Sequence, residues 1–267
     1  AAGLAIVLGA CSSQQKSDVA ETTPNPFFTE YNTPYGVPPF DQIEVAHYKP
    51  ALLKGMEEQT KEVEAIVSNP EEPTFENTIV ALDQCGQLLQ KAMYAFSGQS
   101  SVNTNDEIQE LEREIYPMLS KHSDDISLNP ALFARVTAVY ENQAKFNLDK
   151  EQKKLLEETY KGFVRGGANL PEADQAKLRE LNSEISMLQL TFGQNVLKET
   201  NAFQLVIDNE ADLAGLPEDV KVKAAETAKE MGKEGKWIFT LHNPSVMPFL
   251  QYADNRELRK QIFEAYI

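Results

Sequence analysis

The chain has 267 residues, of which 42% are hydrophobic, and its 25 Lys and Arg against 41 Asp and Glu give a net charge of −16. A chain of this length and composition can bury a sizeable core, in one large domain or two smaller ones. The negative charge repels phosphate backbones, which argues against nucleic acid as a partner. Two cysteines allow at most one disulfide, so the fold does not depend on a cysteine framework.

The N-terminal residues 1–11 resemble the signal segment of a bacterial lipoprotein. Residues 1–10 are apolar but too few to span a bilayer, and Leu8, Gly9 and Ala10 lead directly into Cys11. In such signals the peptide is cut before the cysteine, whose thiol carries a diacylglycerol. We therefore expect a lipid anchor at Cys11 that attaches the protein to a membrane of the cell envelope, facing the periplasm or in the outer membrane. The alternative is a cysteine that ends a hydrophobic N-terminus by chance.

The segment that follows, residues 12–26, is expected to be a flexible tether. It is rich in Ser, Gln, Thr and Pro, and such a composition buries too little apolar surface to fold alone. From about Asp41 onward, apolar residues recur at helical intervals. This period predicts a mainly α fold for the rest of the chain.

The first strong helical pattern covers residues 74–96. Thr74 can accept backbone N–H bonds as the N-cap, and one helix over this range would turn a single apolar face toward a core. That face consists of Phe75, Ile79, Leu82, Leu89, Met93 and Phe96. Cys85 falls within the same helix, and we expect it to be a small core residue rather than a catalytic thiol.

Two shorter helices are expected next. Asn129 can cap a helix that begins at Pro130. The side chains that would face a core from this helix are Leu132, Val136 and Val139. A second helix, over about 148–165, should end at Gly166 and Gly167, because paired glycines adopt backbone angles that other residues resist.

The longest apolar stripe follows Pro171. Its members recur at intervals of three and four, with charged residues such as Arg179 and Glu184 between them, which predicts one long helix. They are Leu178, Leu181, Ile185, Leu188, Phe192 and Val196. Apolar residues at this spacing are expected to face a core, because a cofactor site would need polar anchors beside them.

Strand signals are sparse and confined to the C-terminal third. Residues 203–207 alternate between apolar and more polar or smaller side chains, and residues 237–241 form a short apolar run of β-forming types. We predict that these two segments pair as a two-stranded ribbon. Between them, a helix should begin at Pro217 and end near Gly232 or Gly235.

The last residues predict one more helix. After Asn255 the apolar side chains lie on one helical face, and they are Leu258, Ile262, Phe263 and Tyr266. No glycine, proline or capping residue follows before Ile267. We therefore expect the natural protein to continue beyond this helix.

Residue chemistry alone reveals no catalytic apparatus. The three histidines, His47, His122 and His242, each stand alone, whereas a zinc site commonly places two histidines four residues apart on a helix. Residues 98–102 begin like the G-x-S-x-G nucleophile motif but lack its last glycine, so we expect a plain loop. The many acidic residues are expected to lie on solvated faces.

Three segments together carry a family resemblance. They are PTFENTIVALDQ (73–84), FVRGGANLPEADQAKLRELNSEISMLQLTFGQN (163–195) and WIFTLHNPSVMPFLQYADNRELRKQIFEAY (237–266). In this order and rough spacing they resemble the thimet-oligopeptidase-like zinc metallopeptidases, and most nearly the bacterial peptidyl-dipeptidase type. The resemblance extends from about Pro26 to Ile267.

The resemblance implies an almost wholly helical protein whose two lobes enclose a deep channel. Residues 27–235 would form the N-terminal lobe, and residues 236–267 would begin the second lobe. Within the second lobe, Pro244 and Pro248 would bracket a non-helical approach to a hydrophobic helix. The segment 237–252 would then either lie near the substrate groove or serve packing alone.

The resemblance also implies a function in which zinc, bound by an H-E-x-x-H helix and a downstream glutamate, cleaves short peptides. The peptidyl-dipeptidase type releases dipeptides from a free C-terminus. No H-E-x-x-H occurs in this sequence, so we assign it no catalytic and no metal-binding residue. We expect this chain alone to bind no zinc and to be inactive, and we expect the whole protein to be a monomer.

The alternative is a non-enzymatic helical lipoprotein that ends near Ile267 and serves as a peptide-binding or scaffold module. A reading frame that continues into H-E-x-x-H would favour the enzyme. A stop codon after Ile267 would favour the binding module.

Overall fold

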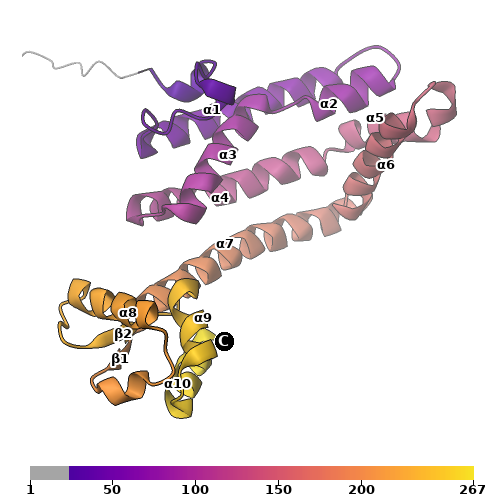
Figure 1. Cartoon of the computed structure of the whole chain (residues 1–267). Helices are drawn as coiled ribbons and strands as arrows, with labels where there is room; N and C mark the ends of the chain where they lie inside the picture. Colours follow the sequence, from indigo (N-terminus) through magenta and orange to yellow (C-terminus); the bar gives the residue numbers. More distant parts are fainter. Residues whose placement is uncertain (1–23) are drawn as a thin grey trace, which may run out of the picture.

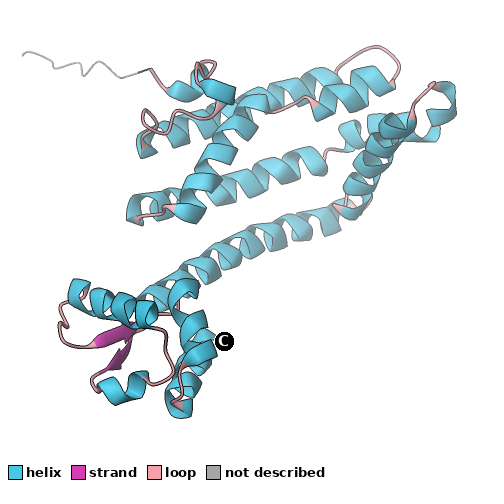
Figure 2. Ribbon diagram, viewed as in Figure 1, coloured by secondary structure: helices cyan, strands magenta, loops and turns pink. Residues whose placement is uncertain are grey.

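The computed structural model describes residues 24–267, which are largely helical (Figure 2). The longer helices are α1 (Val45–Val67), α3 (Gln87–Val102), α4 (Asp106–Ser127), α5 (Pro130–Glu141), α6 (Lys150–Arg165), α7 (Glu172–Ala202), α8 (Glu218–Glu230), α9 (Asn243–Tyr252) and α10 (Arg256–Tyr266). Shorter turns are η1 (Pro26–Phe28), η2 (Pro34–Gly36), η3 (Phe75–Val80), α2 (Ala81–Asp83), η4 (Gln143–Lys145) and η5 (Glu210–Leu213). The two strands are β1 (Leu205–Ile207) and β2 (Trp237–Phe239). The mainly α prediction is confirmed.

The first hydrophobic core lies between η1, α1, α3 and α4. The ring centroid of Tyr48 lies 5.4 Å from that of Phe27 and 5.1 Å from that of Phe96. All three side chains are almost completely buried. Gly55 allows α1 and α3 to approach closely, because a Cβ on this residue would lie only 2.6 Å from the backbone of Leu89. This core joins helices from the first half of the chain.

The residues just before α1 are tied to the same core. Asn25 Nδ2 donates to the carbonyl of His47 at 2.8 Å, and Pro26 begins η1. Lys91 Nζ donates to the Phe27 carbonyl at 3.1 Å and lies 3.9 Å from the centroid of the Tyr31 ring. The C-terminal end of the expected tether is therefore packed, while its residues 12–23 lie outside the described part of the chain.

The second hydrophobic core lies between the C-terminal half of α1, η3, α5 and α6. Asn129 caps α5 as predicted, since its Oδ1 accepts from the backbone N–H groups of Ala131 and Leu132, both at 3.0 Å. The α5 side chains that the sequence assigned to a core are fully buried, namely Leu132, Val136 and Val139. Helix α6 ends at Arg165, directly before the two glycines that were expected to stop it.

The prediction of one continuous helix over residues 74–96 is wrong, because this range forms η3, α2 and α3. Thr74 does cap the first helical turn, because its Oγ1 accepts from the backbone N–H of Asn77 at 3.1 Å. The run then breaks before α3 at Gly86, which has φ +77°, and its N–H donates to Glu62 Oε2 at 2.7 Å. A Cβ at this position would lie 2.5 Å from the Gln59 side chain. The break redirects the chain so that α3 packs along α1.

A smaller C-terminal unit follows α7 (Figure 1). Its two strands pair antiparallel, with Val206 opposite Ile238, so the predicted ribbon is confirmed. Helix α8 begins after Pro217, as expected. The third hydrophobic core combines β1, β2, α8, α9 and α10, and Leu205, Phe239 and Phe249 are among its buried members. This core joins residues on both sides of the expected lobe boundary at 235/236, and that division remains a prediction.

Helix α7 forms over the predicted range, but the expectation that its apolar stripe faces a core is wrong. None of its side chains is fully buried. The stripe members Leu181, Ile185, Leu188, Phe192 and Val196 are between 45% and 71% exposed. With 31 residues α7 is long, yet within residues 24–267 no helix is apolar enough over a sufficient length to cross a membrane.

The cores make a direct stability prediction for two valines. Val136→Ala removes two methyl groups from a fully buried site in α5, and we expect it to lower the free energy of unfolding by about 2 kcal/mol. Val102→Ala removes the same groups from a site that is 85% exposed, and we expect a change within about 0.5 kcal/mol. Urea unfolding followed by circular dichroism measures both. Equal losses for the two variants would contradict the assignment of the second core.

Candidate functional site

The residues that the sequence singled out for chemistry lie far apart in the fold. Cys11 lies outside the described residues. His47 belongs to the first turn of α1, where its Nδ1 accepts from the backbone N–H of Glu44 at 3.0 Å. His122 lies on α4, and His242 directly precedes α9 without a capping hydrogen bond from its side chain. Within residues 24–267, no group of three or more His, Cys, Asp or Glu side chains is placed to hold a metal ion. The described residues therefore do not fit a zinc ion.

Cys85 is a half-buried thiol at the edge of the second core. Its Sγ donates to the carbonyl of Ala81 at 3.1 Å. Burial, together with the nearby carboxylate of Glu62, raises the pKa of the Cys85 thiol to about 11. A thiol with this pKa is protonated at neutral pH, so it is a poor nucleophile. Its position agrees with the structural role expected from the sequence.

The prediction that residues 98–102 form a loop is wrong. They form the last turns of α3, which continues to Val102. Ser100 faces α4, and its Oγ donates to the carboxylate of Glu112. The serine is thus engaged in helix packing and does not sit on a strand-to-helix turn of the kind a nucleophile motif requires.

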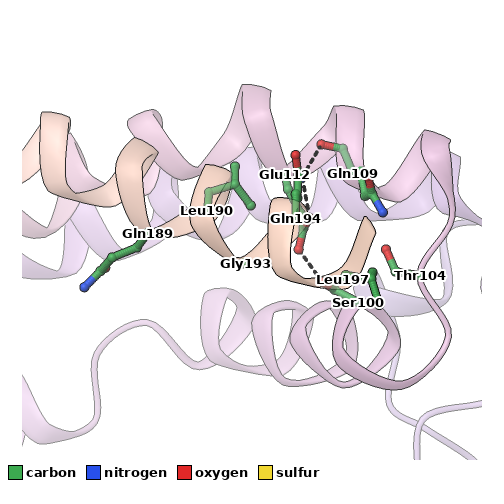
Figure 3. Close-up of a pocket in the computed structure, with 9 residues that line it drawn as sticks. All are labelled: Ser100, Thr104, Gln109, Glu112, Gln189, Leu190, Gly193, Gln194 and Leu197. Carbon is green, nitrogen blue, oxygen red and sulfur yellow. Dashed lines mark hydrogen bonds between the residues drawn. The ribbon is translucent and has the colours of Figure 1, made fainter. Parts of the chain in front are cut away.

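A pocket of about 230 Å³ lies where the C-terminal end of α3 and the first half of α4 meet the last turns of α7 (Figure 3). Ser100 and Thr104 line it from α3 and the turn after it, and Glu112 lines it from α4. Its wall on α7 consists of Gln189, Leu190, Gly193, Gln194 and Leu197. We call this cavity the α7 pocket.

Glu112 is the centre of the α7 pocket, and its side chain is only 6% exposed. Its carboxylate accepts from Ser100 Oγ and from Gln194 Nε2, the latter at 3.2 Å. The Oε1 of Gln194 in turn accepts from Arg113 Nη1 at 2.8 Å. Figure 3 shows Ser100, Glu112 and Gln194 meeting where α3, α4 and α7 come together. A buried carboxylate of this kind is tolerated because hydrogen-bond donors lie beside it.

The polar groups of the α7 pocket are engaged mainly in hydrogen bonds between helices. Thr104 Oγ1 is buried and has no hydrogen-bond partner. Both oxygens of the Glu112 carboxylate already accept hydrogen bonds from α3 and α7. General base catalysis would need a free carboxylate oxygen that points at the reacting group. The network therefore fixes α7 on α4.

A second, more apolar groove of about 510 Å³ lies between α4 and α6 and is also lined by residues of α1, α2 and α3. Its apolar lining consists of Leu82, Leu89, Leu119, Ile126 and Phe163. His122 borders it, with Nε2 2.8 Å from Gln59 Oε1, and burial lowers the pKa of this imidazole. The lowered pKa favours the neutral imidazole, which forms a hydrogen bond with Gln59. The shape and lining of the groove suit an apolar side chain.

The expectation of a non-helical approach bracketed by Pro244 and Pro248 is wrong. Both prolines lie within α9, with Pro244 in its first turn, where the missing backbone N–H costs nothing. Val246 and Phe249 of the same helix are completely buried in the third core. Of the two roles considered for segment 237–252, packing is the one that these contacts support.

Comparison with known proteins gives a consistent set of relatives. Dipeptidyl carboxypeptidase of Escherichia coli (strain K12) is 40% identical over 244 residues, which are 91% of this chain and 36% of that protein. Oligopeptidase A of Haemophilus influenzae is 33% identical over 232 residues, which are 86% of this chain and 34% of that protein. The chain belongs to the thimet-oligopeptidase family. No family model matches it.

The match covers the N-terminal part of these family members. The chain spans about a third of the length of the curated relatives it matches. A more distant relative, the thimet-like oligopeptidase of Dictyostelium discoideum, is 26% identical over 222 residues and is matched over 32% of its length. The family identified from three short segments is thus confirmed over most of the chain.

The polar contacts between α4 and α7 were not predicted. Glu112 and Gln194 carry no motif, and each is a common residue on a helix surface. Their importance comes from which sides of α4 and α7 face each other. The sequence signal available was the absence of charged residues over 185–197, since the solvated side of a helix usually carries them.

A pair of glutamines on α7 tests this interface. Gln194→Ala removes the donor to Glu112 and the acceptor for Arg113, and we expect it to lower the free energy of unfolding by ~1–2 kcal/mol, because the carboxylate stays buried with fewer partners. Gln189→Ala changes the same residue type at an exposed position of the same helix, with a much smaller expected loss. Chemical unfolding of both variants measures the difference. If the two losses were the same, the Glu112 network would not be what holds α7.

Proposed function

We propose that this chain is the N-terminal part of a zinc metallopeptidase that cleaves short peptides and releases dipeptides from their C-termini. The observation that carries the proposal is the 40% identity with dipeptidyl carboxypeptidase of Escherichia coli over 91% of the chain. The identity with oligopeptidase A, 33% over 86% of the chain, supports peptide hydrolysis in general. Dipeptide release is favoured over internal cleavage because the former relative has the higher identity.

In this proposal the described residues supply structure, not chemistry. The three cores build a helical lobe, and α7 carries the C-terminal unit away from the first two cores (Figure 1). We place the zinc ligands and the catalytic glutamate in the further length that the relatives have beyond the match. No catalytic step is assigned to a residue of this chain. The lobe would form one wall of the space that admits short, unfolded peptides.

Peptide hydrolysis tests the proposal directly. We expect the complete natural polypeptide to release the C-terminal dipeptide from an N-acylated tetrapeptide, and a chelator to abolish the release, because zinc supplies the Lewis acid. The same tetrapeptide with an amidated C-terminus is the control, and it should be cleaved far more slowly. We expect the 267-residue chain to release nothing. Product analysis by mass spectrometry reads out each case.

Two outcomes would contradict this proposal. Chelator-sensitive release by the 267-residue chain would place the catalytic site within it. Peptide binding without any cleavage by the complete polypeptide would instead favour the non-enzymatic module.

We further propose that the protein is anchored in the cell envelope by a lipid on Cys11. The support is the apolar run of residues 1–10 that leads into this cysteine through Leu8, Gly9 and Ala10. A peptidase held in this way would act on peptides in the periplasm. Its negative charge would keep the tethered lobe away from anionic lipid surfaces.

Lipid labelling in a bacterial host tests the anchor. When the protein is expressed from its own gene with radiolabelled palmitate, we expect label in the wild type and none in Cys11→Ser. Cys85→Ser is the matched control and should keep the label, because Cys85 lies half-buried in the folded lobe. Label that persists in Cys11→Ser would contradict the anchor.

A further inference from the structure

Helix α7 faces the rest of the described chain with a mixed side, on which hydrogen-bonding side chains lie beside Leu190 and Leu197. Asn182 Nδ2 donates to Asp124 Oδ1 at 2.7 Å, and Asp124 is only 6% exposed. One turn earlier along α7, Arg179 pairs with Asp125 at 2.8 Å, and near the other end Gln194 meets Glu112. These contacts all run between α4 and α7, and they set the rotation of α7 about its own axis.

That rotation leaves the apolar side of α7 in solvent. We define the α7 stripe as Leu181, Ile185, Leu188, Phe192 and Val196, which are 45%, 49%, 60%, 71% and 49% exposed. Residues 185–197 contain no charged side chain. Among residues 24–267, α4 makes the most extensive contact with α7, and it does not cover the stripe. Figure 1 shows α7 running between the N-terminal bundle and the C-terminal unit.

An exposed apolar row of this length marks an interface. Single apolar residues are common on protein surfaces, but a contiguous row of five on one side of a helix signals a covered face. The spacing of three and four residues is the one by which a helix packs against another helix. The occupant of this surface should therefore be an apolar helix face.

We propose that the α7 stripe is the docking surface for the C-terminal remainder of the same polypeptide, which covers it with an apolar helix. This inference rests on the proposed longer peptidase. Dipeptidyl carboxypeptidase of Escherichia coli is matched over 36% of its length, in its N-terminal part, so nearly two-thirds of such a chain is available to pack here. The lack of charge over residues 185–197 fits a permanent apolar partner, because no side chain would need to be desolvated as an ion.

Two other occupants fit less well. A second copy of the chain carries the same net charge of −16, and two such surfaces repel one another. A peptide substrate would bind transiently and would leave five large apolar side chains in water for most of the time. A covalently continuous partner has neither drawback, because it is always present at high effective concentration.

Thiol labelling of the complete natural polypeptide tests the proposal. In a background without its own cysteines, Leu188→Cys places a thiol in the α7 stripe, and Ser183→Cys places one on an exposed site elsewhere on the same helix. We expect a maleimide to label position 188 roughly 100-fold more slowly than position 183, because reaction at a covered site needs local opening. In urea the two rates should become equal.

Each other labelling pattern would overturn the proposal. Equal rates in the native protein would mean that the stripe stays in solvent. Protection at position 188 that disappears on dilution would assign the stripe to a second copy. Protection that needs an added tetrapeptide would assign it to substrate. Peptidase activity measured on the same samples separates the two proposals, since an active enzyme with a freely labelled position 188 fails only the docking proposal.

A charge placed in the stripe provides an independent measurement. We expect Phe192→Asp to lower the melting temperature of the complete polypeptide, because it would bury an unpaired carboxylate. Thr191→Asp adds the same charge at the neighbouring exposed position, about 100° around the helix, and should leave the melting temperature close to that of the wild type. If Phe192→Asp behaved like Thr191→Asp, the stripe would not be covered.

Discussion

The arrangement of this chain depends on the polar contact between α4 and α7. Two carboxylates of α4, Glu112 and Asp124, are almost completely buried, and both are satisfied by side-chain amides of α7, namely Gln194 and Asn182. A buried carboxylate without such donors is costly, so the amides can occupy few other positions. The contact therefore fixes both the direction of α7 and its rotation. It also positions the C-terminal unit, which α7 joins to the rest of the chain.

A polar contact of this kind allows α7 to pack on α4 with one side and leaves the other side available for a second contact. If α7 packed on α4 through the α7 stripe, the side chains of the stripe would be buried within this part of the chain. Hydrogen bonds to Glu112 and Asp124 hold the helix instead, and the apolar side remains free for further packing. The same division fits a chain that spans about a third of the length of its relatives in the thimet-oligopeptidase family. Under the docking proposal, the lobe would be a framework for the further length that those relatives have.

The elements whose signals are local were predicted well. Asn129 and Pro130 started α5 where expected, because a cap and a preset φ act within one turn. The ribbon of residues 205–207 and 237–239 also followed from residue type. The break before α3 was missed, because Gly86 lies inside an unbroken apolar period and its role depends on a bond to Glu62 from another helix. The loop prediction for residues 98–102 was wrong because a partial nucleophile motif does not interrupt a helix that is held by its packing on α4.

By itself, the sequence determined the helical class, the principal helix starts and the family, because caps, periodicity and three characteristic segments are all written in neighbouring residues. The same periodicity could not say which side of α7 faces inward. An apolar stripe predicts a side of the helix that packs against another surface, but it does not identify that surface. The tertiary structure decides this, because the buried Glu112 and Asp124 carboxylates need hydrogen-bond donors. Gln194 and Asn182 of α7 therefore face inward, and the α7 stripe faces outward.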